Sequence, residues 1–133
     1  MDKIKIIVKG NRAALLGSID LIAGTVGQQC SFYFDESWKT LTKKVSYKVG
    51  STVLASHKIE KDETIIPANV LTTAGLPLEI GITGYTSDNS IITPTSWCFI
   101  GNIKNGASVY SDSGNNGEDN ENKKVIYDGG VIV

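Results

Sequence analysis

Apolar and polar residues alternate with a period of two over most of the chain, which predicts β-strands. Isoleucine and valine alternate with lysine over residues 3–9, and cysteine and phenylalanine alternate with other side chains over residues 29–34. Two alternating runs within residues 44–59 are separated by Gly50 and Ser51, which predicts a hairpin. No window of adequate length has the spacing of an amphipathic helix. The pattern therefore predicts an all-β protein.

The later pattern predicts a second hairpin and a central strand. Residues 78–82 alternate, and residues 87–90 supply turn-forming side chains before the apolar residues 91–92. Residues 97–100 are apolar on both faces, which is typical of a central strand covered on both sides. Short strands separated by turns at intervals of about 8 to 12 residues indicate a β-sandwich. We therefore expect a single antiparallel sandwich, immunoglobulin-like or jelly-roll-like, over residues 1–104.

A capped turn is predicted at residues 35–38, between two of these strands. Asp35 has a side chain suited to capping the turn, and Glu36 and Ser37 continue it. We expect Trp38 and Leu41 to fold back onto the core, because large apolar side chains are stabilised by burial.

The composition changes after residue 104. Residues 105–122 are mostly polar and small, which predicts a flexible linker, and residues 123–133 restore β character as a C-terminal strand or hairpin tail. The tail has two possible destinations, an edge of its own sandwich or an edge of a neighbouring chain. Burial of its apolar side chains would contribute on the order of 10 kcal/mol before ordering costs. These oligomerisation and docking candidates are Val125, Ile126, Tyr127, Val131, Ile132 and Val133.

Charge and composition narrow the classes of partner. The 133 residues include 13 basic and 14 acidic side chains, a formal net charge of -1, so the basic excess typical of nucleic-acid binding is absent. No apolar run approaches the roughly 20 residues that span a bilayer, and the N-terminus does not resemble a signal peptide. We expect no nucleic-acid partner, no membrane insertion and synthesis in the cytoplasm. Cys30 and Cys98 are then expected to be reduced core residues.

Motifs for catalysis or cofactor binding are scarce. His57 is the only histidine, and no second base or nucleophile motif accompanies it, so we expect it to be packed or at the rim of the core. Residues 81–84 are glycine-containing but have no phosphate-binding lysine, which favours close packing over nucleotide binding. The segment 112–121 is acidic, but its sequence does not match a calcium-binding loop. We assign no catalytic, cofactor-binding or metal-binding residues and expect no enzyme.

Exposed aromatic side chains offer a different kind of site. Tyr33 and Tyr85 are the best candidates for a sugar-binding platform, with Asp88 and Asn89 as polar glycan contacts. Aromatic residues at alternate strand positions are more often part of the core. A carbohydrate-binding module that recognises host-surface glycan is therefore the alternative interpretation.

Five blocks of the sequence resemble, in the same order, a small β-sandwich module found in phages and prophages of Gram-positive and gut bacteria. The blocks are residues 32–43, 66–71, 78–84, 92–97 and 103–107. That module usually lies at the N-terminal end of tail-fibre, baseplate or other virion proteins, where it is taken to attach the rest of the chain to the particle. It is not known as an enzyme.

This resemblance implies a non-enzymatic structural protein of the virion, made in the cytoplasm of the bacterial host. Because the sequence ends after residues 123–133, we expect a small component such as a head fibre, a capsid decoration subunit, or a tail or baseplate adaptor. The expected partners are other virion proteins and further copies of the same chain in a homo-oligomer.

Overall fold

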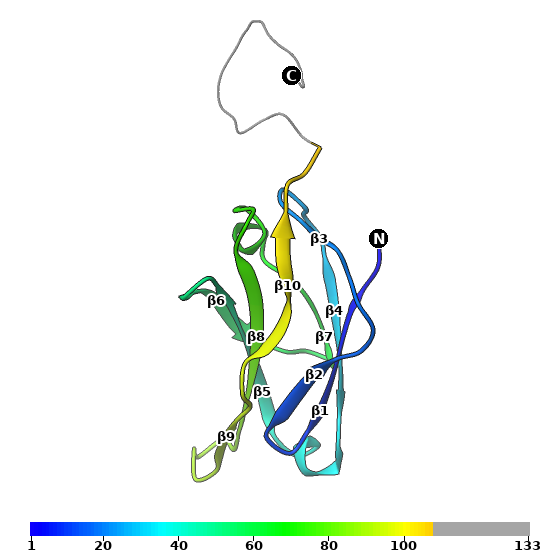
Figure 1. Cartoon of the computed structure of the whole chain (residues 1–133). Helices are drawn as coiled ribbons and strands as arrows, with labels where there is room; N and C mark the ends of the chain where they lie inside the picture. Colours follow the sequence, from blue (N-terminus) through cyan, green and yellow to red (C-terminus); the bar gives the residue numbers. More distant parts are fainter. Residues whose placement is uncertain (108–133) are drawn as a thin grey trace, which may run out of the picture.

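The computed structural model describes residues 1–107, which form two β-sheets around one hydrophobic core (Figure 1). The strands are β1 (Ile4–Lys9), β2 (Arg12–Leu15), β3 (Leu21–Ile22), β4 (Gln29–Phe34), β5 (Thr42–Val49), β6 (Thr52–Lys58), β7 (Glu63–Ile65), β8 (Pro77–Tyr85), β9 (Ile92–Pro94) and β10 (Cys98–Lys104). The helical elements of this part are two 3₁₀ turns, η1 (Glu36–Trp38) and η2 (Ala68–Val70). The prediction of an all-β, sandwich-like fold is confirmed.

The two sheets differ in size. The first has the strand order β2-β1-β4-β7, and the second has the order β3-β10-β8-β5-β6, with β9 paired to β8. No helix in residues 1–107 is long and apolar enough to cross a membrane. Of the predicted linker at 105–122 only the first three residues are described, and the predicted tail at 123–133 lies outside the described residues.

The prediction of purely antiparallel sheets was wrong, because both sheets are mixed. β1 pairs with β4 in parallel, and β10 pairs with β3 in parallel. Residues 10–28 connect β1 to β4, and this crossover is long enough for β4 to enter the sheet in the same direction as β1. Side-chain alternation has the same period in parallel and antiparallel strands, so the sequence pattern carries no information about direction.

The core is built from the inward face of each strand, as the alternation predicted. Strands β1, β5 and β8 each place three apolar side chains there at 5% exposure or less: Ile4, Ile6, Val8, Val45, Tyr47, Val49, Leu78, Ile80 and Ile82. Burial of each such side chain is worth roughly 1.5–3 kcal/mol relative to exposure. Both predicted hairpins, β5–β6 and β8–β9, are formed.

One edge of the sandwich is closed by the turn between β1 and β2. The Asn11 side chain donates hydrogen bonds to Thr93 Oγ1 at 2.7 Å and to the Pro94 carbonyl at 2.8 Å. The Asn11 carbonyl in turn accepts a bond from the Ser96 backbone N–H at 3.0 Å. These bonds join the first sheet to the segment that leads into β10.

The opposite edge is closed by a polar cluster of Tyr47, His57 and Thr64. The Tyr47 hydroxyl lies 2.9 Å from His57 Nε2, and Thr64 Oγ1 on β7 lies 3.3 Å from the same nitrogen. Burial raises the pKa of Tyr47, so its hydroxyl stays neutral and available for hydrogen bonding. The expectation that His57 is packed at the rim of the core is confirmed.

The predicted capped turn is η1. Asp35 Oδ1 accepts the Ser37 backbone N–H at 3.0 Å, and Oδ2 accepts the Gly10 N–H at 2.8 Å. The Ser37 hydroxyl also donates to Oδ1, and this bond, followed by the backbone bonds, holds the pKa of Asp35 below its ordinary value. Trp38 is 1% exposed, and its indole N–H donates to the Gly10 carbonyl at 2.8 Å.

Two further predictions concern β10 and the cysteines. Cys98 and Ile100 face the core, but Trp97 is 39% exposed and Phe99 is 57% exposed, so the prediction of a strand covered on both sides was wrong. No second layer covers this outer face within the described residues. Cys30 and Cys98 are both buried and free, as predicted. Burial raises the pKa of Cys30 to about 12.

Candidate functional site

The outer face of the second sheet carries a polar and aromatic surface. Because alternate residues of β8 face the core, Glu79, Gly81, Thr83 and Tyr85 face outward. The register between β5 and β8 places lysine side chains next to this row. Lys48 pairs with Glu79, Ser46 with Gly81, and Lys44 with Thr83.

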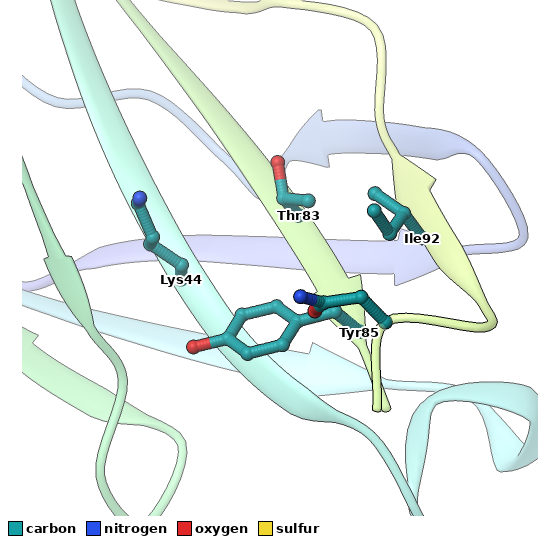
Figure 2. Close-up of a pocket in the computed structure, with 5 residues that line it drawn as sticks. Lys44, Thr83, Tyr85 and Ile92 are labelled. Atoms are coloured by element: carbon teal, nitrogen blue, oxygen red, sulfur yellow. The ribbon is translucent and has the colours of Figure 1, made fainter. Parts of the chain in front are cut away.

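A hollow of about 280 Å³ lies at the end of this surface. Figure 2 shows Thr83 and Tyr85 on β8, flanked by Lys44 from β5 and Ile92 from β9. Asn89, from the turn between β8 and β9, completes the lining. We call this surface, lined by these five residues, the Tyr85 hollow. Three strands and one turn therefore combine to form a single concave site.

The turn beside the hollow is organised by Asp88. Asp88 Oδ1 accepts hydrogen bonds from the Ser90 backbone N–H at 3.0 Å and from Thr86 Oγ1 at 2.8 Å. Hydrogen bonds from Ser90 and Thr86 lower the pKa of Asp88 to about 2. The next residue, Asn89, has a φ of 59°, a left-handed conformation that asparagine tolerates better than most residues. Asp88 thus holds the turn that presents Asn89.

Several polar groups of the Tyr85 hollow are free to bind a ligand. Within residues 1–107, the Lys44 ammonium has no carboxylate partner within 4.0 Å. The Asn89 amide and the Tyr85 hydroxyl also make no side-chain hydrogen bond inside the described part. The site combines a cation, an amide, hydroxyl groups and an aromatic ring, which suits binding of a small polar molecule.

A second feature of the same sheet is a pair of exposed aromatic residues on its outer face, Trp97 and Phe99. Lys48 Nζ lies 4.5 Å from the centre of the Trp97 ring and 3.3 Å from Glu79 Oε1. Trp97 packs closely over Gly81, where an added Cβ would lie 3.1 Å from the indole. Phe99 is the cross-strand neighbour of Glu79. Trp97 is therefore held in place while part of its ring, and most of Phe99, faces solvent.

The structure separates the four predicted glycan-contact residues. Tyr85 and Asn89 share the Tyr85 hollow, and Asp88 supports it from the turn. Tyr33 is 49% exposed, but it lies on β4 of the other sheet beside a different hollow. The six oligomerisation and docking candidates, Val125, Ile126, Tyr127, Val131, Ile132 and Val133, lie outside the described residues.

Three residues that line the Tyr85 hollow, Lys44, Thr83 and Ile92, were not predicted from the sequence. Lys44 and Thr83 stand at outward positions of their strands, which the alternation indicates, but their pairing depends on the register of β5 against β8. Ile92 reaches the hollow because it pairs with Tyr85 in the β8–β9 hairpin. The hairpin was predicted, so its register could have placed Ile92 beside Tyr85.

No group of three or more histidine, cysteine, aspartate or glutamate side chains gathers in a metal-binding arrangement anywhere in residues 1–107. Comparison with known proteins adds no assignment: no family model, no curated protein and no solved structure matches the chain.

Proposed function

We propose that this chain is a non-enzymatic structural protein of a bacteriophage virion: a head-fibre, capsid decoration, or tail or baseplate adaptor component. It acts by self-association and by docking to other virion proteins. The five sequence blocks that resemble a virion module support this proposal. The proposal includes an immunoglobulin-like or jelly-roll-like class for the sandwich and a location in the virion after synthesis in the host cytoplasm.

The observation that best supports docking is the exposed aromatic pair, Trp97 and Phe99, on the outer face of the second sheet. Tryptophan and phenylalanine are enriched in protein interfaces, where their burial supplies much of the binding energy. Lys48 and Gly81 contact the Trp97 ring and restrict it before any partner arrives. A restricted side chain loses less conformational entropy on binding, so this surface is suited to docking.

Self-association is tested by the mass of the protein in solution. Light scattering would compare the full chain with a chain that ends at Ser108 and keeps every described residue of the sandwich. We expect a defined oligomer that becomes a monomer on truncation, because residues 123–133 then no longer link the copies. The same number of copies per particle for the two chains would contradict self-association through residues 123–133.

Docking is tested by binding to phage particles that lack this protein. Phe99→Ala should weaken binding about tenfold, since truncation of a central interface aromatic costs roughly 1–2 kcal/mol. Tyr33→Ala is the matched control, because Tyr33 is also an exposed aromatic residue but lies on the first sheet. Equal loss in both variants, or no binding by the unmodified chain, would contradict docking through this face.

A second candidate function is recognition of host-surface glycan by a carbohydrate-binding module. The Tyr85 hollow favours it, because an aromatic ring and unpaired polar groups converge there. A glycan array with the full chain tests it directly. Binding that disappears in Tyr85→Ala would support this function, and the absence of binding to any glycan would exclude it.

A further inference from the structure

The polar lining of the Tyr85 hollow points to the chemical class of its ligand. We propose that it binds a single sugar residue that carries an anionic group, either a carboxylate or a phosphate. This inference rests on the second candidate function above, recognition of glycan, and specifies what kind of sugar the site takes. It is independent of the docking face at Trp97 and Phe99.

The preference for an anion comes from Lys44. Lys3, Lys48 and Lys104 each lie within 4.0 Å of a carboxylate, at Glu63, Glu79 and Asp20 respectively. The charge of Lys48, which lies on the same outer face of β5, is thereby paired with that of Glu79. Lys44, like most lysines of residues 1–107, has no such partner, but it is the one cation that lines the Tyr85 hollow, and no carboxylate is part of that lining.

Asp88 is the acidic residue nearest in sequence to the lining residues, and its carboxylate accepts hydrogen bonds within its own turn. Asp88 precedes Asn89, but its carboxylate accepts hydrogen bonds from Thr86 and Ser90 and is not part of the lining. The carboxylate therefore holds the turn, lies outside the lining and forms no ion pair with Lys44. An anionic group of a ligand would gain a charge-assisted hydrogen bond from Lys44.

The preference for a sugar comes from Tyr85 and its neighbours. Tyr85 is half-buried, and Figure 2 shows its ring extending from β8 toward the strand that carries Lys44. An aromatic ring at a polar site offers an apolar surface to the C–H face of a sugar ring, while the Asn89 amide and the Thr83 hydroxyl offer donors and acceptors to its hydroxyl groups. An inorganic anion would use Lys44 and leave the ring without a role.

The size of the hollow limits the ligand. Its volume of about 280 Å³ lies just below the range of roughly 300–1,000 Å³ that is usual for drug-sized ligands. Space of this size fits one sugar residue with its charged substituent. A longer saccharide would place its other residues along the outer face of the sheet.

The test is a titration of the full chain, followed by NMR of its backbone amides at low ionic strength. The probes are glucuronic acid, glucose 6-phosphate, glucose and inorganic phosphate. We expect both acidic sugars to shift amides of residues 83–92. Glucose should bind about fivefold more weakly, the difference that corresponds to one exposed ion pair.

Two variants and one control identify the residues responsible. Lys44→Gln should reduce binding of the acidic sugars about fivefold and leave glucose unchanged, whereas Tyr85→Ala should abolish the shifts for every sugar. Tyr33→Ala should behave as the unmodified chain, since Tyr33 lies on the first sheet. Added salt should remove the advantage of the acidic sugars, because salt screens an exposed charge.

The other outcomes overturn the inference in distinguishable ways. Equal binding of glucose and glucuronic acid would refute the preference for an anion while keeping glycan recognition. Equal binding of inorganic phosphate and glucose 6-phosphate would show an anion site without sugar recognition. No shift with any probe, together with a glycan array without binding, would refute the inference and the glycan function together.

Discussion

Gly84 offers a sharp test of how the core of this sandwich is packed. It lies on the inward face of β8, and its backbone does not have a positive φ, so alanine is compatible with its conformation. An alanine Cβ would lie 2.7 Å from Trp38 Cζ3 and 2.8 Å from Leu41 Cδ1. Both distances are shorter than real Cβ contacts, so Gly84→Ala requires the indole or its surroundings to move.

The cost of that movement can be estimated from what holds Trp38. Its N–H is bound to the Gly10 carbonyl at 2.8 Å, and its ring packs 5.5 Å from the Phe34 ring centre. Overpacking of a close-packed core costs about 1–3 kcal/mol, and replacement of glycine by alanine in a strand returns about 0.5–1 kcal/mol. We expect Gly84→Ala to lower the free energy of unfolding by about 1–2 kcal/mol.

Gly81→Ala is the matched control on the same strand. An added Cβ there lies 3.1 Å from the Trp97 ring, a smaller overlap than at Gly84, and because this ring is 39% exposed a shift of a few tenths of an ångström relieves it. We expect a change of no more than about 0.5 kcal/mol, with the clash offset by the gain from replacing glycine. Urea unfolding followed by tryptophan fluorescence measures both variants.

The two variants should differ clearly in melting temperature. A loss of 1–2 kcal/mol in a domain of this size corresponds to a fall in melting temperature of roughly 4–16 °C. Equal unfolding midpoints for Gly84→Ala and Gly81→Ala would refute the reasoning, because it depends on the Trp38 indole being fully enclosed and the Trp97 indole being partly exposed.

Three further predictions concern the edge cluster, the turn and the thiols. Tyr47→Phe removes the hydroxyl that lies 2.9 Å from His57 and should cost about 1–2 kcal/mol in urea unfolding; an unchanged midpoint would contradict a stabilising bond. The folded pKa of Asp88 is about 2, below the unfolded value of about 3.9, so its contribution to stability is present above pH 4 and disappears as the pH falls toward 2. Asp88→Asn should reduce the fall in melting temperature between pH 4 and pH 2, and an unchanged pH dependence would refute the stabilising role of the Asp88 carboxylate. With a pKa of about 12, Cys30 should react with a thiol reagent at pH 8 only as fast as the domain unfolds, and rapid labelling of the native chain would contradict its burial.

Features that depend on neighbouring residues could be predicted from the sequence. The alternation of Ile4, Ile6 and Val8 with lysine indicated both the strand and its buried face, because a pleated strand sends successive side chains to opposite sides. The turn at Asp35 was equally local, since its capping bond joins residues two apart. The chemistry of the turn between β8 and β9 was likewise visible in its own residues.

The separation of Tyr33 from Tyr85 was decided by the tertiary structure. Both are aromatic residues at strand positions, but β4 and β8 belong to different sheets. Assignment of a strand to a sheet depends on contacts between distant residues. A list of exposed aromatics therefore could not show which of them share a site.

By itself, the sequence determined that this chain forms β-strands, which faces most of them bury and where several turns occur. Strand direction, the exposure of Trp97 and Phe99, and the meeting of Lys44 with Thr83 and Tyr85 were decided by the tertiary structure. The physical reason is that side-chain alternation specifies a face and not a partner. Register, parallel pairing and the cover over each face arise from contacts between residues far apart in the chain.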